Sequence, residues 1–251
     1  MLDIGIIGYG VVGKATYKLL REGNNINILD PEIGHTGDLT KSDIIFICIN
    51  EKNKSMGNLI SLTNHLVSQN KKCLFIIRTT VIPETTDKLS IRYKREFVFM
   101  PEFLREWNAK EDAEKPDKIV IGTENGATFE LLKNIFKKAI QEKMIQVKPI
   151  EAELAKLALN SLALIKVVFA EELYDLTEAY KADYENIYKI FKMDQNVNQR
   201  HLIPGKDNYR GANGKCLPKD TDFLIQAGEQ KSRMALLETA RILNNLFLKV
   251  K

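Results

Sequence analysis

The sequence contains little cysteine and little histidine, with three residues of each among 251. Cys48, Cys73 and Cys216 are too scattered to suggest a disulfide framework or a zinc site. No stretch approaches the ~20 apolar residues of a membrane-spanning helix, and no block of like charge resembles a nucleic-acid-binding arm. The first residues also lack the basic start and the cleavage site of a signal peptide. We therefore expect a cytoplasmic protein that binds no metal, nucleic acid or membrane.

The sequence does contain enough apolar residues for a sizeable core, since 44% of its residues are hydrophobic. In the first half, short apolar runs alternate with amphipathic segments, as is typical of a parallel sheet covered by helices on both faces. Between Asp30 and Asp43, two glycines and a proline predict a loop. We expect strands at Leu2–Ile7, Asn25–Leu29, Asp43–Ile49, Cys73–Arg78, Phe97–Met100, Lys118–Ile121 and Met144–Val147, and helices at Val11–Arg21, Asn58–Gln69 and Ala127–Gln141.

The second half begins with a long segment that is expected to be helical. From Glu151 to about Lys181 there is no glycine or proline. Apolar residues fall on nearly every side of this predicted helix, so it must be covered from several directions, by other helices or by another subunit. After it we expect a helix at Asp183–Lys192, a polar loop over Met193–Asn213, and helices at Asp220–Ala227 and Lys231–Lys249.

A glycine-rich turn follows the first predicted strand. The run Gly8-Tyr9-Gly10-Val11-Val12-Gly13 has the glycines needed for a tight turn, for close approach of a pyrophosphate and for helix–strand packing. It also places a helix N-terminus at the anion. Asp30, at the end of the second strand, can accept hydrogen bonds from the adenosine ribose. Glu32 follows shortly after and would repel a 2′-phosphate, so we predict NAD rather than NADP. The alternative is a plain glycine turn with a capping aspartate.

These patterns together predict an α/β protein of two domains. Residues 1–149 would form an N-terminal Rossmann domain, with a doubly wound and mostly parallel sheet that binds NAD. Residues 150–251 would form a smaller, all-helical domain built around the long helix.

Cys216 lies on a polar, glycine-rich loop, is flanked closely by lysines and stands just before a predicted helix start. Positive charge and a helix N-terminus both stabilise a thiolate, so Cys216 is a candidate nucleophile. Asp220 could orient a water molecule or a neighbouring cation. Cys48 and Cys73 lie in apolar strands, where inert packing is the expected role.

Lys156 and Asn160 are four residues apart and therefore share one face of the long helix. Two polar side chains on an otherwise apolar stretch suggest a buried polar pocket, because unsatisfied groups there would be costly. The alternative is a lysine whose amine extends to solvent and an asparagine that makes a structural hydrogen bond.

Several motifs taken in order resemble the UDP-glucose/GDP-mannose dehydrogenase family. The resemblance extends from about residue 2 to about residue 228, and two of its motifs are specific: Pro-Glu-Phe-Leu-Arg-Glu and Cys-x-Pro-Lys-Asp. The residues that carry it are Gly8–Gly13, Asp30, Thr79–Pro83, Pro101–Glu106, Pro116–Gly122, Glu153–Asn160 and Cys216–Asp220.

Enzymes of that family oxidise the C6 primary alcohol of a nucleotide sugar to a carboxylate, using two NAD in succession. The resemblance implies that Cys216 attacks an aldehyde-level intermediate, giving a thiohemiacetal and then a thioester. Lys156 and Asn160 would stabilise oxyanions. Asp220 and Thr80 would position the water that takes part in proton transfer and thioester hydrolysis.

The resemblance also implies roles for the Pro-Glu-Phe-Leu-Arg-Glu segment. Glu102 would serve as the general base or orient it, and Glu106 would lie between substrate and nicotinamide. Family members pair through the long helix, so a homodimer through residues 151–181 is expected. The implied cofactor-binding residues are Gly8, Tyr9, Gly10, Val11, Val12, Gly13, Asp30, Thr80 and Glu106. The implied substrate-binding residues are Glu102, Phe103, Leu104, Lys156, Asn160, Tyr209, Gly211 and Gly214.

The sequence departs from the family pattern in three places. Pro31–Lys41 is shorter than the corresponding family segment, which should mainly weaken the grip on adenosine. Trp107 replaces a glycine, and the cysteine loop has Ala212-Asn213 where the family has Phe-Gly. Family members also continue into a further domain that binds the nucleotide, so we expect the substrate to be held by fewer contacts or with the help of a partner protein.

Two other functions are compatible with the motifs. A 2-hydroxyacid-type dehydrogenase or reductase also combines a Rossmann domain with a long helix carrying Lys-x-x-x-Asn. It would use Lys156 but would need no covalent cysteine. A non-catalytic NAD-binding half of a split complex is the second alternative. Oxidation of a nucleotide sugar through Cys216 is the leading hypothesis.

Overall fold

The computed structural model describes residues 1–51, 55–70, 72–104, 108–136, 138–205, 209–229 and 231–250. The first half contains an eight-stranded sheet of order β3-β2-β1-β4-β5-β6-β7-β8. β1 lies between β2 and β4 and is parallel to both, whereas β3 is antiparallel to β2, and β7 to β6. The strands are β1 Asp3–Ile7, β2 Asn25–Asp30, β3 His35–Thr36, β4 Ile44–Ile47, β5 Leu74–Ile77, β6 Phe97–Phe99, β7 Ile119–Gly122 and β8 Met144–Val147.

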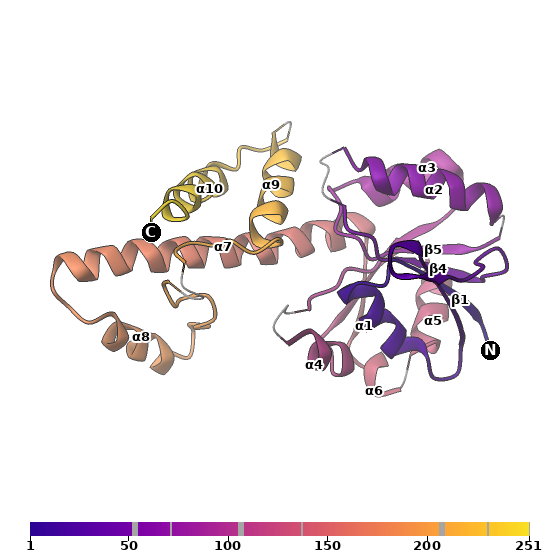
Figure 1. Cartoon of the computed structure of the whole chain (residues 1–251), viewed down its shortest axis with the longest axis horizontal. Coiled ribbons are helices and arrows are strands. Elements are labelled where there is room, and N and C mark those ends of the chain that lie inside the picture. Colours follow the sequence, from indigo (N-terminus) through magenta and orange to yellow (C-terminus); the bar gives the residue numbers. More distant parts are fainter. Residues whose placement is uncertain are drawn as a thin grey trace. The chain divides into compact units, whose positions relative to one another are not determined.

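Helices cover both faces of this sheet (Figure 1), with α2 and α3 on one face and α1, α4, α5 and α6 on the other. The central strands are apolar at successive positions because both of their faces are buried. The bounds of the helices are α1 Val11–Leu20, α2 Gly57–Gln69, α3 Thr85–Tyr93, α4 Ala109–Glu114, α5 Gly126–Asn134 and α6 Lys138–Gln141.

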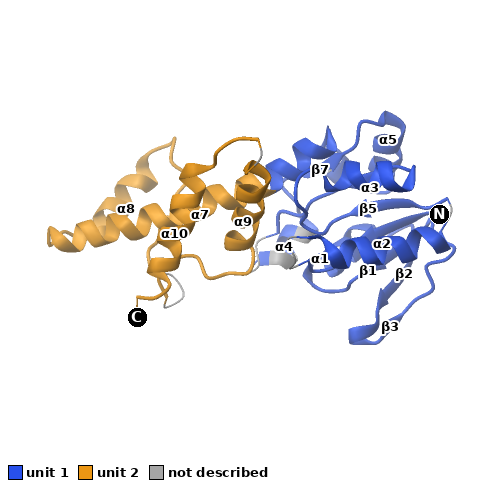
Figure 2. Cartoon of the chain, turned by 90° about the horizontal axis from the view of Figure 1, so that it is seen from above, with its two compact units in different colours: residues 1–156 blue, residues 157–251 orange. Residues whose placement is uncertain are grey.

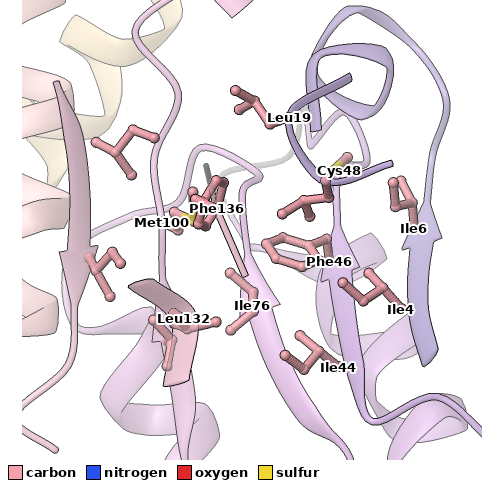
Figure 3. Close-up of a cluster of buried hydrophobic side chains, with 14 of the residues drawn as sticks. Ile4, Ile6, Leu19, Ile44, Phe46, Cys48, Ile76, Met100, Leu132 and Phe136 are labelled. Atoms are coloured by element: carbon pink, nitrogen blue, oxygen red, sulfur yellow. The ribbon is translucent and has the colours of Figure 1, made fainter. Parts of the chain in front are cut away.

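The core on the α1 side of the sheet is built from alternate strand residues. Figure 3 shows side chains of β1, β4 and β5, such as Ile4, Phe46 and Ile76, among those of Leu19 and Leu132 from the covering helices. Each of these side chains is at most 8% exposed, and burial of one such side chain contributes roughly 2 kcal/mol.

The fold prediction for the first half is confirmed, with local differences. The strand and helix positions differ mainly at their ends, but the helix expected at Ala127–Gln141 is divided into α5 and α6. The predicted loop after Asp30 contains a 3₁₀ turn at Pro31–Ile33 and the short edge strand β3. The sequence prediction did not include α3 and α4.

The second half is helical. It begins with α7 Pro149–Ala179, followed by α8 Tyr184–Met193, α9 Leu217–Gly228 and α10 Ala235–Phe247. Leu164 and Val168 of α7 pack with Ala240 and Phe247 of α10 in a second apolar cluster. None of the helices in the described part of the chain combines the length and the apolar composition needed to cross a membrane.

The chain divides into two compact units, Met1–Lys156 and Leu157–Lys251 (Figure 2). They are called unit 1 and unit 2 below. The division falls within α7, so the first turns of this helix belong to the sheet domain. The domain boundary predicted after residue 149 stays a prediction, and the division into compact units falls seven residues later, after Lys156.

Candidate functional site

The turn after β1 has the geometry of a phosphate-binding loop. Gly8 has a φ of +82°, and a Cβ there would lie 2.7 Å from the backbone oxygen of Cys48. A Cβ on Gly13 would lie 1.9 Å from the backbone oxygen of Gly8. At Gly10, by contrast, a Cβ would have no atom of the described residues within 4 Å. The turn therefore requires glycine at two positions and leaves the third open to an approaching group.

The N-terminus of α1 points its backbone amides out of this loop. Gly10 is the N-cap, and no side chain of the described residues caps the helix. An anion can therefore take the place of a capping side chain. Val11 is 55% exposed beside the opening, whereas Val12 packs against the core. The observed cradle fits the pyrophosphate of a dinucleotide.

Asp30 closes the same loop from β2. Its Oδ2 accepts a hydrogen bond of 2.6 Å from the backbone amide of Tyr9. The Tyr9 ring packs edge-on against His35, with 4.9 Å between the ring centroids. Asp30 thus has a structural role in the loop, while its contact with a ribose stays a prediction.

The carboxyl ends of β4 and β5 lie next to this loop in the sheet. Thr79, two residues after the end of β5, donates its hydroxyl to the backbone oxygen of Ile49 at 3.0 Å. This bond holds the segment that continues into Thr80, a partly buried residue. Ligands of open α/β sheets bind at such strand ends, so the position of Thr80 is compatible with its predicted role.

Glu102 and Lys156 form a buried ion pair in unit 1. Lys156 Nζ lies 2.9 Å from Glu102 Oε1, and the two side chains are only 6% and 13% exposed. The backbone amide of Leu104 donates to Glu102 Oε2 at 2.7 Å. The Lys156 amine also lies 5.6 Å from the ring centroid of Phe103. The Lys156 amine is therefore buried and paired within unit 1, and the polar pocket expected on α7 stays a prediction.

The charges around Glu102 keep it ionised. Burial alone would raise the pKa of the Glu102 carboxyl, but Lys156, the Leu104 amide and Arg78 together lower it below its usual value. Arg78 is 5% exposed, and its Nε has no hydrogen-bond partner among the described residues. Sequence reasoning did not identify Arg78, whose signal was only a basic residue at the end of an apolar strand.

Glu153, which lies on α7 one turn before Lys156, is another buried carboxylate. It accepts hydrogen bonds from the Glu84 amide at 2.6 Å and from the Thr86 amide and hydroxyl at 2.9 and 2.6 Å. These donors form the N-terminus of α3, so Glu153 caps that helix from a distant part of the chain. Burial raises the pKa of Glu153 to about 7.

In unit 2, Cys216 is the N-cap of α9 and is exposed. Asp220, in the first turn of α9, is buried and accepts a hydrogen bond of 2.6 Å from the Asn160 side-chain amide. Lys219 Nζ lies 3.4 Å from the other carboxylate oxygen of Asp220. The structure thus brings three of the predicted residues, Cys216, Asp220 and Asn160, to the region where α9 begins.

The other two cysteines have the inert setting that was expected. Cys48 and Cys73 are buried. Burial raises the pKa of the Cys48 thiol to about 11 and that of Cys73 to about 12. Both therefore remain protonated at neutral pH, and a thiolate is the nucleophilic form of cysteine.

The loop before Cys216 is held by residues that sequence reasoning missed. Asn244 of α10 is fully buried, accepts the Ala212 amide at 2.7 Å and donates to the Ala212 backbone oxygen at 3.1 Å. Glu171 of α7 binds the same loop at Gly211, whose φ is +75°. Tyr209 is partly buried and Gly214 is exposed. Glu106 and Trp107 lie outside the described residues.

Two sequence models of one family match this chain. The model of the UDP-glucose/GDP-mannose dehydrogenase family, NAD binding domain, matches residues 18–140. The model of the central domain of the same family matches residues 150–246. The fit of the glycine loop to a dinucleotide and the first of these matches confirm NAD as the cofactor.

Individual relatives agree with this assignment. UDP-glucose 6-dehydrogenase of Rickettsia felis is 31% identical over 202 residues, which are 74% of this chain and 44% of the relative. UDP-glucose 6-dehydrogenase YwqF of Bacillus subtilis is 29% identical over 243 residues, which are 91% of this chain and 54% of the relative. The chain therefore spans about half the length of these curated relatives.

A solved structure shares the fold. A UDP-glucose dehydrogenase from Pyrobaculum islandicum superposes with a TM-score of 0.84 and 23% identity, covering 98% of this chain and 68% of that one. The predicted α/β architecture is confirmed by this similarity. With both family models matched in order along the sequence, the chain belongs to the UDP-glucose/GDP-mannose dehydrogenase family.

Proposed function

We propose that this chain oxidises the C6 primary alcohol of a nucleotide sugar to a carboxylate in two NAD-dependent steps. The observation that carries the proposal is the exposed thiol of Cys216 at the N-terminus of α9, beside the buried Asp220–Asn160 pair. A dehydrogenase that stops after one hydride transfer needs no such thiol. The names of the relatives favour a UDP-hexose as substrate, and a GDP-hexose is the other substrate in the name of the family.

Lys156 would act on the oxygen of the substrate. The first step converts the alcohol to an aldehyde, and its oxygen carries negative charge as the hydroxyl proton passes to the water that Asp220 and Thr80 would position. The Lys156 ammonium, held in a nearly dry setting by Glu102, would stabilise that charge, and the Asn160 amide would donate to the same oxygen. When bound, NAD accepts one hydride in each of the two oxidation steps.

Glu102 fits an orienting role better than the role of a strong base. Its lowered pKa makes it a weak proton acceptor at neutral pH, whereas its bond to Lys156 fixes the position of the amine. We therefore propose that Glu102 holds the Lys156 amine, with its polar hydrogens, near the reacting carbon. We also propose that Glu106 lies between the sugar and the nicotinamide.

Cys216 would carry the substrate through the second oxidation. Its thiolate adds to the aldehyde carbon, so that a C–S bond forms and the carbonyl oxygen becomes the oxyanion of a thiohemiacetal. Loss of hydride leaves a thioester. Water, positioned by Asp220 and Thr80, then attacks the thioester, the C–S bond breaks, and the carboxylate and the free thiol are released.

The remaining predicted contacts would bind the sugar. Phe103 and Leu104 follow Glu102 on the segment after β6, and Tyr209, Gly211 and Gly214 belong to the loop before Cys216. Because a working thiolate requires a reduced cysteine, we place the protein in the cytoplasm.

The proposal includes a homodimer through α7. Leu159, Leu162, Phe169, Leu176 and Tyr180 are between 45% and 77% exposed. The spacing of three or seven residues places the four residues of α7 on one face of the helix, and Tyr180 follows directly after its end. A row of exposed apolar side chains of this kind is typical of a protein–protein interface, and a second copy of α7 offers the same row in return.

Leu162→Glu should disrupt this dimer, because it places a charge within the row of apolar side chains. We expect a mass near twice 28.6 kDa for the unchanged chain and near 28.6 kDa for the variant, measured by light scattering at micromolar concentration. Leu131→Glu is the matched control, since Leu131 is also a partly exposed leucine (43%) but lies on α5. A monomeric unchanged chain, or equal effects of both substitutions, would refute the proposed interface.

The proposed activity is tested by incubating the purified chain with NAD and a panel of UDP- and GDP-sugars. We expect NADH formation with at least one UDP-hexose and a carboxylate as the product. Clear NAD binding without turnover of any nucleotide sugar would favour the non-catalytic alternative. Turnover of a 2-hydroxyacid instead would favour the single-hydride dehydrogenase.

A further inference from the structure

Glu171 is a buried carboxylate that holds a distant segment of unit 2. Its side chain lies on α7 and is 1% exposed. Oε1 accepts the backbone amides of both Gly205 and Gly211, each at 3.0 Å. Oε2 accepts the Arg210 Nε at 2.8 Å. One side chain therefore binds the backbone at both Gly205 and Gly211.

Arg210 supplies the charge that this burial requires. Its guanidinium also donates to the Glu171 backbone oxygen at 3.0 Å and to Asp175 at 2.7 Å, and it lies 4.8 Å from the ring centroid of Phe247. Burial would lower the pKa of Arg210, but the bonds to Asp175 and Glu171 raise it. The guanidinium therefore gives the buried Glu171 carboxylate a positively charged partner.

The backbone just after Gly211 is held by α10. Asn244 makes two hydrogen bonds with the backbone of Ala212. Gly211, between Arg210 and Ala212, has a φ of +75°, and a Cβ there would lie 3.1 Å from Asn244 Oδ1. The backbone at residues 210–212 is therefore fixed from α7 and from α10, and there is little room for another arrangement.

We propose that Glu171 is a positioning residue for the nucleotide sugar, acting through the loop that leads to Cys216. This inference rests on the proposed function, because Tyr209, Gly211 and Gly214 are the residues that would contact the sugar. Glu171 itself touches neither the substrate nor the cofactor. Glu171 fixes the position of the sugar-binding loop. Loss of its side chain should therefore weaken sugar binding and leave NAD binding in unit 1 unchanged.

Two substitutions of Glu171 distinguish the contributions of its individual hydrogen bonds. Glu171→Ala removes the acceptors for Gly205, Gly211 and Arg210 together. Glu171→Gln keeps one carbonyl oxygen that can accept both glycine amides, but it replaces the oxygen facing Arg210 by a donor. Glu172→Ala is the matched control, because Glu172 is the adjacent glutamate on α7 and is exposed.

The experiment combines steady-state kinetics with amide hydrogen exchange on the full chain. For Glu171→Ala we expect the KM for the nucleotide sugar to rise about tenfold or more, since small displacements of binding groups are costly. The KM for NAD should stay within about twofold. Exchange should accelerate in peptides that contain Gly205 and Gly211, because their amides lose their acceptor. Glu171→Gln should show a smaller change in both quantities, and Glu172→Ala none.

The results can overturn the proposal in two ways. A purely structural role would lower the melting temperature but leave the KM for the sugar unchanged in the folded protein. Unchanged exchange at Gly205 and Gly211 in both Glu171 variants would show that Glu171 does not hold the loop. If Glu171→Ala does not fold, Glu171→Gln decides by the same two readouts.

The two proposals can also fail separately. If the unchanged chain oxidises no nucleotide sugar, the proposed function fails, and the positioning role fails with it for that substrate. Accelerated amide hydrogen exchange in Glu171→Ala would then still show that Glu171 holds the loop. Turnover by the unchanged chain together with an unaltered sugar KM in Glu171→Ala would overturn the positioning role alone.

Discussion

The two compact units bury a glutamate of α7 in different surroundings. In unit 1, Glu153 receives hydrogen bonds from the neutral donors of residues 84–86, and burial raises its pKa to about 7. In unit 2, Glu171 accepts hydrogen bonds from two backbone amides and from the guanidinium of Arg210. Both side chains are 1% exposed, so the surroundings differ mainly in whether a cation is present.

This difference affects how the charge of Glu153 in unit 1 depends on pH. Neutral donors alone do not offset the desolvation of a carboxylate, so Glu153 takes up a proton near neutral pH. The guanidinium of Arg210 keeps its charge over the whole accessible range. The junction of α3 with α7 should therefore respond to pH near neutrality. The following predictions test this contrast and the separate contributions of the two units.

The largest effect is expected from Cys216→Ser, which removes the reactive group of unit 2 and leaves unit 1 intact. A serine hydroxyl is a far weaker nucleophile than a thiolate at neutral pH. Acid formation should fall by about 10³-fold or more, while the Kd for NAD stays unchanged. Product analysis and NAD titration measure the two quantities. An undiminished rate of acid formation would refute the thioester mechanism.

Lys156→Met should give the next largest effect, because it removes the buried cation of unit 1. Loss of one charged oxyanion contact typically lowers kcat by about 10²–10³-fold. Lys118→Met is the matched control, since Lys118 Nζ lies 4.6 Å from the centroid of the same Phe103 ring but has no proposed role. Comparable kcat values for the two variants would contradict the assignment of Lys156.

Glu153→Gln should flatten the pH dependence of stability between about pH 4.5 and pH 7. In this range the folded protein keeps a proton on Glu153 that the unfolded chain has released. The stabilisation is therefore complete below the ordinary pKa of 4.5 and is lost as the pH rises through about 7. The difference amounts to about 3 kcal/mol.

Urea unfolding of both proteins across this pH range measures the effect. Glu130→Gln serves as the control, because Glu130 is exposed on α5. Parallel stability profiles for the unchanged chain and Glu153→Gln would show that Glu153 is not the titrating group.

The cofactor loop could be predicted from the sequence because its requirements are local. A strand, a glycine turn and a helix N-terminus occupy consecutive residues, and each needs a specific residue type within a short span. The long helix α7 was equally clear, since an uninterrupted run without glycine or proline has few alternatives.

Other parts depend on contacts between distant residues, and these have no local pattern. The nine residues of α3, Thr85–Tyr93, have weak apolar periodicity, and the helix is capped by Glu153 from 67 residues further along the chain. The bonds of Glu171 join residues that are 34 and 40 positions apart. The pairing of Glu102 with Lys156 spans 54 positions, and the sequence did not predict it.

The number of NADH molecules formed per molecule of nucleotide sugar tests the proposed reaction most directly. In the proposed reaction each oxidation step releases one hydride, and the covalent intermediate on Cys216 carries the aldehyde to the acid. We predict two NADH and one carboxylate per sugar for the unchanged chain, and no carboxylate for Cys216→Ser. One NADH per sugar, with the same product from both proteins, would contradict this reaction.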